Sequence, residues 1–207
     1  MKKRLAWNFE IDTGAPLNLP VVKEEHNEDI HWESRFFWPE RDIIPLSGLD
    51  KRFLELSRYK IKHRSDTYYL LPDADCNIKE RSGEMTYKPL VERTKCASAY
   101  GKKIKLEDDS TSVINAHGEQ TPLHALIQWA TNEGRPVLVN KEALIYKFES
   151  HPPAKLELAR LSIDDKIYFS VGIESHARVL VEDLAQHIIG DRETSDYVTF
   201  LKQCRKG

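Results

Sequence analysis

The 207-residue sequence is poor in cysteine and lacks any long hydrophobic run. Its three cysteines (Cys76, Cys96 and Cys204) are an odd number at spacings that fit neither a disulfide framework nor a zinc site. We therefore expect a reducing, cytoplasmic setting. The basic start at residues 1–4 is not followed by an apolar stretch, so the sequence predicts neither a signal peptide nor a membrane span.

The sequence also lacks an excess of charge of one sign. It has 31 basic and 33 acidic residues, a net charge of -2, which argues against a general nucleic-acid binder. A basic pocket inside a neutral exterior is still compatible with this balance. Hydrophobic residues at 40% and charged residues at 31% are typical of a soluble globular protein. With no internal repeat, we expect one domain over residues 28–207, preceded by an arm or extra edge strand at residues 1–27.

The most informative stretch is residues 79–90, which predicts two short strands joined by a turn at Ser82-Gly83. Side chains two apart share one face of a strand, so Lys79 and Arg81 point the same way. Lys88 lies on the corresponding face of the second strand. The hairpin therefore has a cationic face and an apolar face. Taken alone, the hairpin is better explained as the solvated outer face of an ordinary antiparallel sheet.

The same mixture of charged and apolar faces recurs in the other predicted strands. Strands are expected within residues 30–37, 59–71, 137–148 (with a turn before 144), 155–161 and 167–173, and helices within 49–56, 121–134, 175–189 and 197–204. Many short strands with a few helices between them predict an antiparallel α+β domain with a closed or strongly curved sheet.

If the sheet closes, its charged face must line the interior. Lysine and arginine are seldom buried unless they are paired or hold a ligand. The basic residues expected there outnumber the carboxylates, so the interior is expected to take a polyanion. These residues are Arg35, Lys79, Arg81, Lys88, Lys141 and Lys155.

Several motifs together resemble the CYTH superfamily, the triphosphate tunnel metalloenzymes. The family's opening Glu-x-Glu-x-Lys strand is similar to residues 31–35, and its Asp-Thr-Tyr-Tyr strand to residues 66–73. The basic hairpin, a helix leading into a Gly-x-x-Pro-Val strand (residues 126–141) and a final Ser-Tyr helix (residues 195–201) complete the resemblance. It implies a tunnel or barrel of eight antiparallel strands with flanking helices, and charged side chains in the lumen.

The sequence departs from the family pattern mainly at acidic positions. Most basic residues of the implied tunnel are present, whereas several of the acidic, metal-binding residues are replaced. The departures are His31 for the first glutamate, Arg35 for the lysine, Ala143 for a basic residue, Ala159 for an acidic one, and Ser170-Val171-Gly172 for a Glu-x-Glu strand that leaves only Glu174 nearby.

The resemblance implies that carboxylates hold Mg²⁺ or Mn²⁺ while basic side chains clamp the phosphates. The candidate metal ligands are Glu33, Glu157 and Glu174, and for Glu157 a salt bridge to a lysine is an equally good explanation. His31 is better explained as a structural histidine. Glu33 and Arg35 are the candidate catalytic residues. The candidate phosphate-binding residues are Arg35, Lys79, Arg81, Lys88, Lys141 and Lys155.

Three functional hypotheses follow, all with a small-molecule triphosphate or nucleotide as ligand. The first is a metal-dependent triphosphatase, because phosphoryl transfer depends mainly on charge neutralisation and alignment. The second is a non-catalytic module that binds a phosphate ligand and has lost its metal site. The third, an adenylate cyclase, is less favoured because none of the residues selects a purine. The sequence leaves the substrate and the oligomeric state open.

Overall fold

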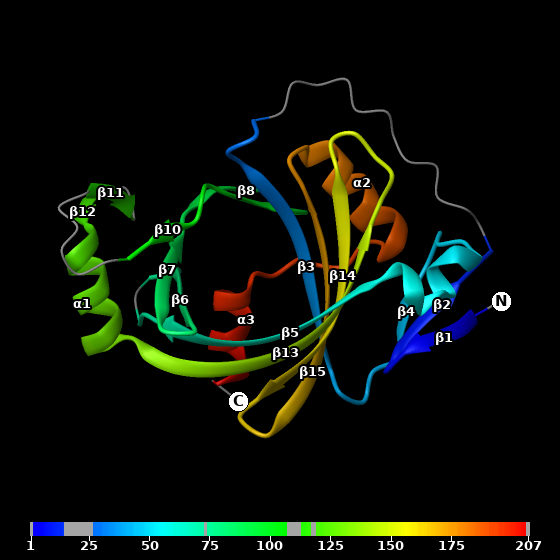
Figure 1. The fold of residues 1–207 in the computed structure, drawn as a ribbon, viewed down its shortest axis with the longest axis horizontal. Helices are drawn as coiled ribbons and strands as arrows, with labels where there is room; N and C mark the ends of the chain where they lie inside the picture. The colour runs from blue at the N-terminus through cyan, green and yellow to red at the C-terminus, as the bar shows by residue number, and fades with distance from the viewer. Residues whose placement is uncertain (1, 15–26, 73, 107–112, 117–118, 206–207) are drawn as a thin grey trace.

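The computed structural model describes residues 2–14, 27–72, 74–106, 113–116 and 119–205. Within these ranges, no helix is both long and apolar enough to cross a membrane. A ten-stranded antiparallel sheet dominates the structure (Figure 1). In sheet order its strands are β10 (Ile104–Lys105), β7 (Glu84–Lys88), β6 (Asn77–Arg81), β5 (Lys60–Leu70), β13 (Arg135–Lys147), β14 (Ala154–Ile163), β15 (Lys166–Ser175), β3 (His31–Pro39), β9 (Ser98–Tyr100) and β8 (Leu90–Arg93).

The sheet curls until its two ends meet along a single hairpin. Strand β7 pairs with β10, and β8 pairs with β9. Only Pro89 separates β7 from β8 along the chain. Between the two strand pairs, the Gly101 N–H donates to the Pro89 carbonyl at 3.0 Å. The β7–β8 segment therefore pairs along the β9–β10 segment as one bent hairpin. Because β7 also bonds β6 and β9 also bonds β3, the pairing runs full circle. Counting each bent segment as one strand, the ring is β3, β9–β10, β7–β8, β6, β5, β13, β14 and β15.

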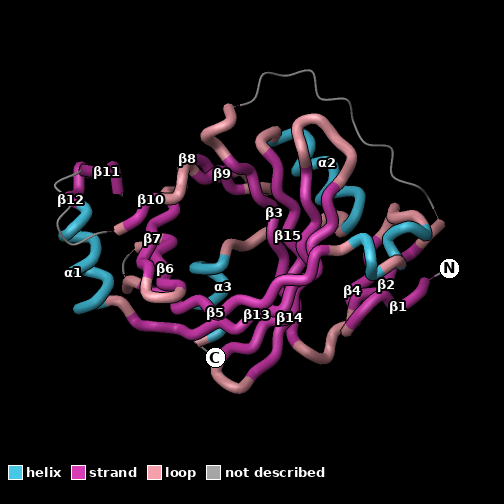
Figure 2. Tube along the Cα trace, viewed as in Figure 1, coloured by secondary structure: helices cyan, strands magenta, loops and turns pink. Residues whose placement is uncertain are grey.

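The curled antiparallel sheet with flanking helices confirms the predicted α+β fold class. Figure 2 shows the strands curving around α3 (Tyr197–Cys204), and the contacts place this helix on the inner face. There the Phe200 ring stacks on Phe37 with centroids 3.8 Å apart. The inner face is therefore part apolar, beneath α3, and part charged.

The outer face carries the largest apolar core. Helix α2 (Arg178–Ile188) packs there through residues such as Leu180 and Leu184. A small sheet of β1 (Lys2–Ala6), β2 (Phe9–Asp12) and β4 (Ile44–Leu46) joins the same core, with Phe9 against Phe169. The strands β1 and β2 thus do not extend the ten-stranded sheet. A domain boundary at residue 28 stays a prediction, and residues 15–26 of the expected arm lie outside the described residues.

A third apolar cluster lies beside the β6–β7 hairpin. Helix α1 (Leu123–Glu133) packs Leu126 with Ile78 and Tyr87. The two-stranded pair β11 (Val113–Ala116) and β12 (Glu119–Pro122) precedes it. The hairpin turn itself is as predicted, because Ser82 and Gly83 both have positive φ, at 51° and 79°, as a tight two-residue turn requires.

Several predicted boundaries were wrong. The helix expected at residues 49–56 is two short 3₁₀ helices, η1 (Lys51–Leu54) and η2 (Leu56–Arg58), because Glu55 is extended between them. The turn expected before residue 144 does not form, since β13 pairs with β5 and β14 without interruption there. Helix α1 begins one residue later than expected, at Leu123, and α2 begins three residues later, at Arg178, whereas α3 begins and ends as predicted.

Candidate functional site

Charged side chains from four adjacent strands meet on the inner face of the curled sheet. The register places Arg35 of β3 opposite Gly172 of β15, Gly172 opposite Glu157 of β14, and Glu157 opposite Ile145 of β13. Directly opposite residues share a face of a sheet, and α3 packs on that same face. Arg35 is only 3% exposed. Burial of an arginine requires paired charges, and the surrounding strands supply them.

Three carboxylates converge on the Arg35 guanidinium. Its Nε donates to Glu33 Oε1 at 2.5 Å, and its Nη1 donates to Glu157 Oε1 at 3.0 Å. Its Nη2 lies 3.5 Å from Glu174 Oε1. These are the three carboxylates that the resemblance implies as metal ligands. The structure brings them together, with the guanidinium at their centre.

The missing side chain of Gly172 leaves the room that the Arg35 guanidinium fills. A Cβ at position 172 would lie 2.5 Å from Nη2, 2.7 Å from Cζ and 2.8 Å from Nη1. Real Cβ contacts of this length essentially do not occur. Position 172 therefore accepts only glycine while Arg35 keeps its place.

Two further groups surround Arg35. Lys141 of β13 donates to Glu157 Oε1 at 2.9 Å and is 9% exposed. The ring of Tyr197, the first residue of α3, lies 4.9 Å from the Arg35 guanidinium carbon and 5.5 Å from Lys141 Nζ. Cation–π contacts of this length add to the stability of buried cations. Helix α3 therefore closes one side of the charged cluster.

The neighbouring cations determine the charge states of these carboxylates. Burial by itself raises the pKa of Glu33, but Arg35 and Lys88 outweigh it and hold the pKa at about 2. Glu157 has a pKa well below its usual value for the same reason, with Lys141 and Arg35 overcoming burial. The pKa of Glu174 is raised instead, by burial and by the two neighbouring carboxylates. Two of the three carboxylates are thus firmly ionised at neutral pH.

A second group of charges lies on β5, β6 and β7. Asp66 accepts from Arg81 Nε at 2.5 Å, and Lys79 Nζ lies 3.4 Å from its other oxygen. Burial lowers the pKa of Lys79 to about 8, although the nearby Asp66 opposes the shift. Lys88 Nζ lies 3.5 Å from Glu33 Oε2 and 4.2 Å from the Tyr100 ring centroid, which joins this group to the first.

A third group contains basic side chains without a countercharge. Lys62, Arg64 and Lys155 lie on the inner face by register and are partly buried. None of the three has a carboxylate within ion-pair distance in the described part of the chain. Burial lowers the pKa of Lys62, and Arg64, Lys60 and Lys155 lower it further.

Lys62 and Arg64 were missed by the sequence reasoning, which identified the strand but not its charged face. The signal was present in the alternation of Lys60, Lys62, Arg64 and Asp66 along β5. The predicted residues Arg35, Lys79, Arg81, Lys88, Lys141 and Lys155 all lie on the inner face with them. The expectation of one shared cationic surface therefore matches the placement, while the role of each residue stays a prediction.

His31 lies at the start of β3, on the same face of the strand as Glu33 and Arg35. Its ring packs on His176 with centroids 4.1 Å apart. Burial, then the neighbouring His176 and Lys88, lowers the His31 pKa. The structural role of His31 stays a prediction.

The donor set does not fit the Mg²⁺ or Mn²⁺ that the resemblance implies. Among the described residues, no group of three His, Cys, Asp or Glu side chains is arranged to hold a metal ion. Glu33, Glu157 and Glu174 converge, but their facing oxygens contact the Arg35 guanidinium. A metal bound between them would have to displace this cation.

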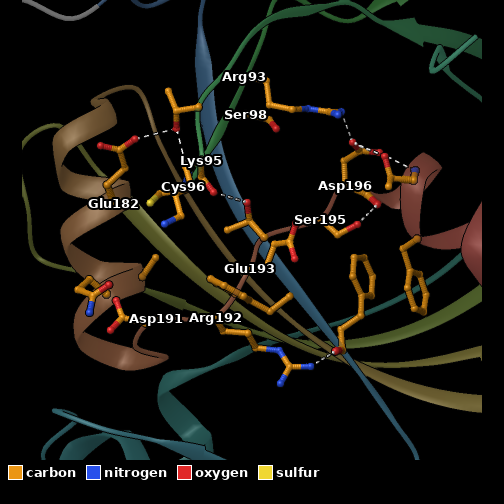
Figure 3. Close-up of a pocket in the computed structure, with 18 of the residues that line it drawn as sticks. Arg93, Lys95, Cys96, Ser98, Glu182, Asp191, Arg192, Glu193, Ser195 and Asp196 are labelled. Carbon is orange, nitrogen blue, oxygen red and sulfur yellow. Dashed lines mark hydrogen bonds and ion pairs between the residues drawn. The ribbon is translucent and has the colours of Figure 1, made fainter.

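A cavity of about 830 Å³ lies beside β3, between α2, the segment leading into α3, α3 itself and the β8–β9 hairpin (Figure 3). Its charges are mixed: Arg93 pairs with Asp196, and Glu182, Asp191 and Glu193 also line it. A second cavity of about 10 Å³, room for roughly one water molecule, lies against Glu33 and Arg35. Ser98, Thr194, Ser195 and Asp196 line both cavities.

The segment between α2 and α3 covers the part of β3 that β9 leaves unpaired. The Ser195 N–H donates to the Arg35 carbonyl at 2.8 Å, and Arg192 donates to the Phe37 carbonyl at 3.1 Å. Asp196 then caps α3 by accepting from the Thr199 N–H at 2.9 Å. The backbone at Arg35 is thereby tied to the start of the helix that carries Tyr197.

No protein-family model matches the chain, and no curated protein is similar to it in sequence. Among solved structures, the chain is similar to a proposed adenylate cyclase from Bacillus halodurans. The two are 9% identical with a TM-score of 0.37, and the match covers 86% of this chain and 90% of that one. A likeness at this level has no bearing on activity.

Proposed function

We propose that the protein is a divergent CYTH-like protein that binds a triphosphate, or another polyanionic phosphate ligand, on the inner face of its curled sheet. The observation that carries this proposal is the imbalance of charge on that face. Among the described residues, the basic side chains on that face outnumber the carboxylates. The basic residues include Arg35, Lys60, Lys62, Arg64, Lys79, Arg81, Lys88, Lys141 and Lys155, and the carboxylates are Glu33, Asp66, Glu84, Glu157 and Glu174.

Five of these basic side chains fall into two groups, which differ in whether a carboxylate already binds them. Arg35 and Lys141 are buried and bonded to carboxylates, so they organise the site. Lys62, Arg64 and Lys155 have no carboxylate within ion-pair distance among the described residues, and they are already partly removed from water. A polyanion placed between them would relieve their mutual repulsion and gain charge-assisted hydrogen bonds. These three residues are therefore the expected first contacts of the ligand.

Lys79 and Lys88 extend this surface toward β6 and β7. Both are half-buried, and each is held by a single carboxylate at 3.4 Å and 3.5 Å. Distances of this size leave both ammonium groups able to turn toward phosphate oxygens. A linear ligand with several charged groups would be able to contact both sets of lysines, whereas a single phosphate would satisfy only one.

Between the hypotheses of turnover and of binding, the contacts favour binding. Metal-dependent hydrolysis needs carboxylates that are open to a metal ion, and here they face Arg35. Hydrolysis would require the ligand to draw Arg35 away from all three. We therefore propose a phosphate-ligand binding module, and the triphosphatase hypothesis becomes a distinct outcome of the test.

The test is calorimetric titration of the purified protein with tripolyphosphate in buffer freed of divalent metals. We expect saturable binding that weakens about tenfold or more in a Lys62→Met/Arg64→Met variant, since two charge-assisted contacts are lost. The matched control is Arg160→Met on the outer face, where the arginine pairs with Glu142. Equal affinity in the wild type and both variants would contradict the proposed site. Phosphate release with added Mg²⁺ or Mn²⁺ would support the triphosphatase instead.

A further inference from the structure

We infer that Arg35 is a built-in cation that takes the place of a divalent metal, so that the site accepts its phosphate ligand in the metal-free form. The inference rests on the proposed function for its ligand. Its structural part, the occupation of the carboxylate centre by a guanidinium, depends only on the contacts of Arg35.

The Arg35 guanidinium lies between three carboxylates. All three of its nitrogens contact carboxylate oxygens, and those carboxylates come from three different strands. A cation that bridges carboxylates from separate strands is the arrangement expected of a bound metal ion. Arg35 supplies the positive charge and the bridging contacts from within the chain.

Gly172 leaves the space that the long side chain of Arg35 occupies. A Cβ at position 172 would lie within 2.8 Å of the Arg35 Cζ and both Nη atoms. Gly172 lies directly opposite both Arg35 and Glu157 in the sheet, so it is the position from which a side chain would enter the same space. The Arg35 guanidinium therefore fills the space that a side chain at position 172 would otherwise occupy.

The cations already present around these carboxylates would repel a divalent metal ion. A divalent ion between Glu33 and Glu157 would lie next to Arg35, and also next to Lys141, which is 2.9 Å from Glu157 Oε1. Lys88 is a further cation beside Glu33. Like charges at such separations in a buried site repel strongly. The carboxylates are thus already neutralised, and the cluster has no unmet need for a metal.

The presence of Arg35 in the carboxylate centre determines whether the ligand binds with or without Mg²⁺. Polyphosphates and nucleotides bind Mg²⁺ in solution, and a metal-dependent site takes the complex. A site with its own cation takes the free polyanion, so Mg²⁺ competes with the protein for ligand. The inference therefore predicts the sign of the metal effect: Mg²⁺ weakens binding here, whereas it strengthens binding at a metal-dependent site.

The first experiment titrates tripolyphosphate into wild-type protein without divalent metal and again with Mg²⁺ in excess over the ligand. We expect the apparent affinity to fall by about tenfold or more in Mg²⁺, by mass action. An affinity that rises in Mg²⁺ would overturn the inference and leave the proposed function standing. Failure to bind in both conditions would overturn the proposed function and the ligand part of the inference, whereas the structural part, the exclusion of metal by Arg35, is tested by the second experiment.

The second experiment needs no phosphate ligand and therefore separates the two proposals. Mn²⁺ is titrated into wild-type protein and an Arg35→Ala variant, and bound Mn²⁺ is followed by electron paramagnetic resonance. We expect saturable binding to the variant, whose three carboxylates are vacated, and none to the wild type at the same concentrations. Stoichiometric Mn²⁺ binding to the wild type that a Glu33→Gln change abolishes would overturn the inference.

An Arg35→Ala variant that does not fold is replaced by Arg35→Lys, whose shorter side chain carries one ammonium group in place of the three-nitrogen guanidinium. Folding is checked by circular dichroism. We expect weaker exclusion of Mn²⁺ in this variant than in the wild type, because one donor group cannot engage all three carboxylates at once. Identical behaviour of the lysine variant and the wild type would contradict a specific role for the guanidinium.

Discussion

Arg35 and Lys141 donate to the same atom, Oε1 of Glu157, at 3.0 Å and 2.9 Å. The two cations come from β3 and β13, which are not neighbours in the sheet. One carboxylate oxygen therefore joins strands on either side of β14, and all three groups are buried. This shared contact places the two cations at fixed positions before any ligand binds.

Glu157→Gln should destabilise the protein strongly. The change leaves two buried cations with a neutral acceptor, and removal of one partner of a buried ion pair costs about 3–5 kcal/mol. Urea unfolding would measure the loss. The matched control is Glu142→Gln on β13, whose pairs with His63 and Arg160 are partly exposed and are expected to contribute about 0–1 kcal/mol. Equal losses in the two variants would contradict the assigned burial of the charge cluster.

Gly172→Ala should destabilise the protein through a clash with Arg35, by about 1–3 kcal/mol as for other overpacked sites. The clash should largely disappear in an Arg35→Lys background, because the lysine side chain has no guanidinium in that space. A double-mutant cycle by thermal unfolding measures this coupling. Additive effects of the two changes would show that residue 172 and Arg35 do not compete for the same volume.

Tyr197→Phe should leave the free energy of unfolding unchanged or raise it. The Tyr197 hydroxyl is buried and has no hydrogen-bond partner among the described residues, so its removal loses no bond and ends an unfavourable burial. Tyr59→Phe is the control, because the Tyr59 hydroxyl donates to the Phe53 carbonyl at 2.8 Å and its loss should cost about 1 kcal/mol. Equal destabilisation of both variants in urea would indicate an internal partner for Tyr197.

Ligand affinity should fall as the pH rises through about 8, the pKa to which burial lowers Lys79. The sign follows from the charge: below this pH the ammonium is protonated and attracts phosphate, and above it the neutral amine does not. A Lys79→Arg variant keeps its charge throughout, so its affinity should change less between pH 7 and pH 9.5. Calorimetric titrations at both pH values compare the two proteins, and the comparison cancels the titration of the ligand itself. Parallel pH profiles would exclude Lys79 as the titrating group.

The lowered pKa of Lys79 also predicts how the free energy of unfolding depends on pH when no ligand is bound. The folded-state pKa of Lys79 is about 8, below the roughly 10.4 of an unfolded lysine, so the unfolded chain binds more protons between these values. The contribution of Lys79 to stability therefore rises with pH across this window. A Lys79→Met variant should lack this rise in urea unfolding measured from pH 8 to pH 10, and a rise of equal size in that variant would contradict the assignment.

Local patterns determined the strands and the identity of their faces. Alternation of residue types predicted that Arg35, Lys79, Lys88 and Lys141 would share one surface, and the Ser82-Gly83 turn followed from backbone preferences alone. The final helix was predicted to the residue, since Asp196 provides a local cap. Each of these features depends on interactions within a few residues of sequence.

Pairing between distant strands overrode local signals elsewhere. The turn predicted before residue 144 is absent because β5 and β14 bond the strand on both sides, and continuous pairing outweighs a weak turn preference. Lys62 and Arg64 became part of the site only when β5 was placed beside β13. Their charged face could be found in the sequence, but its position opposite Lys141 could not.

The sequence by itself determined that a cationic face exists and that it needs closure to be buried, because side-chain alternation along a strand is a local property. Only the tertiary structure decided what the cations face. Register between strands far apart in the chain brought Glu33, Glu157 and Glu174 to the Arg35 guanidinium and placed Gly172 where that guanidinium needs room. Such contacts depend on volume and charge across strands, which no single stretch of sequence contains.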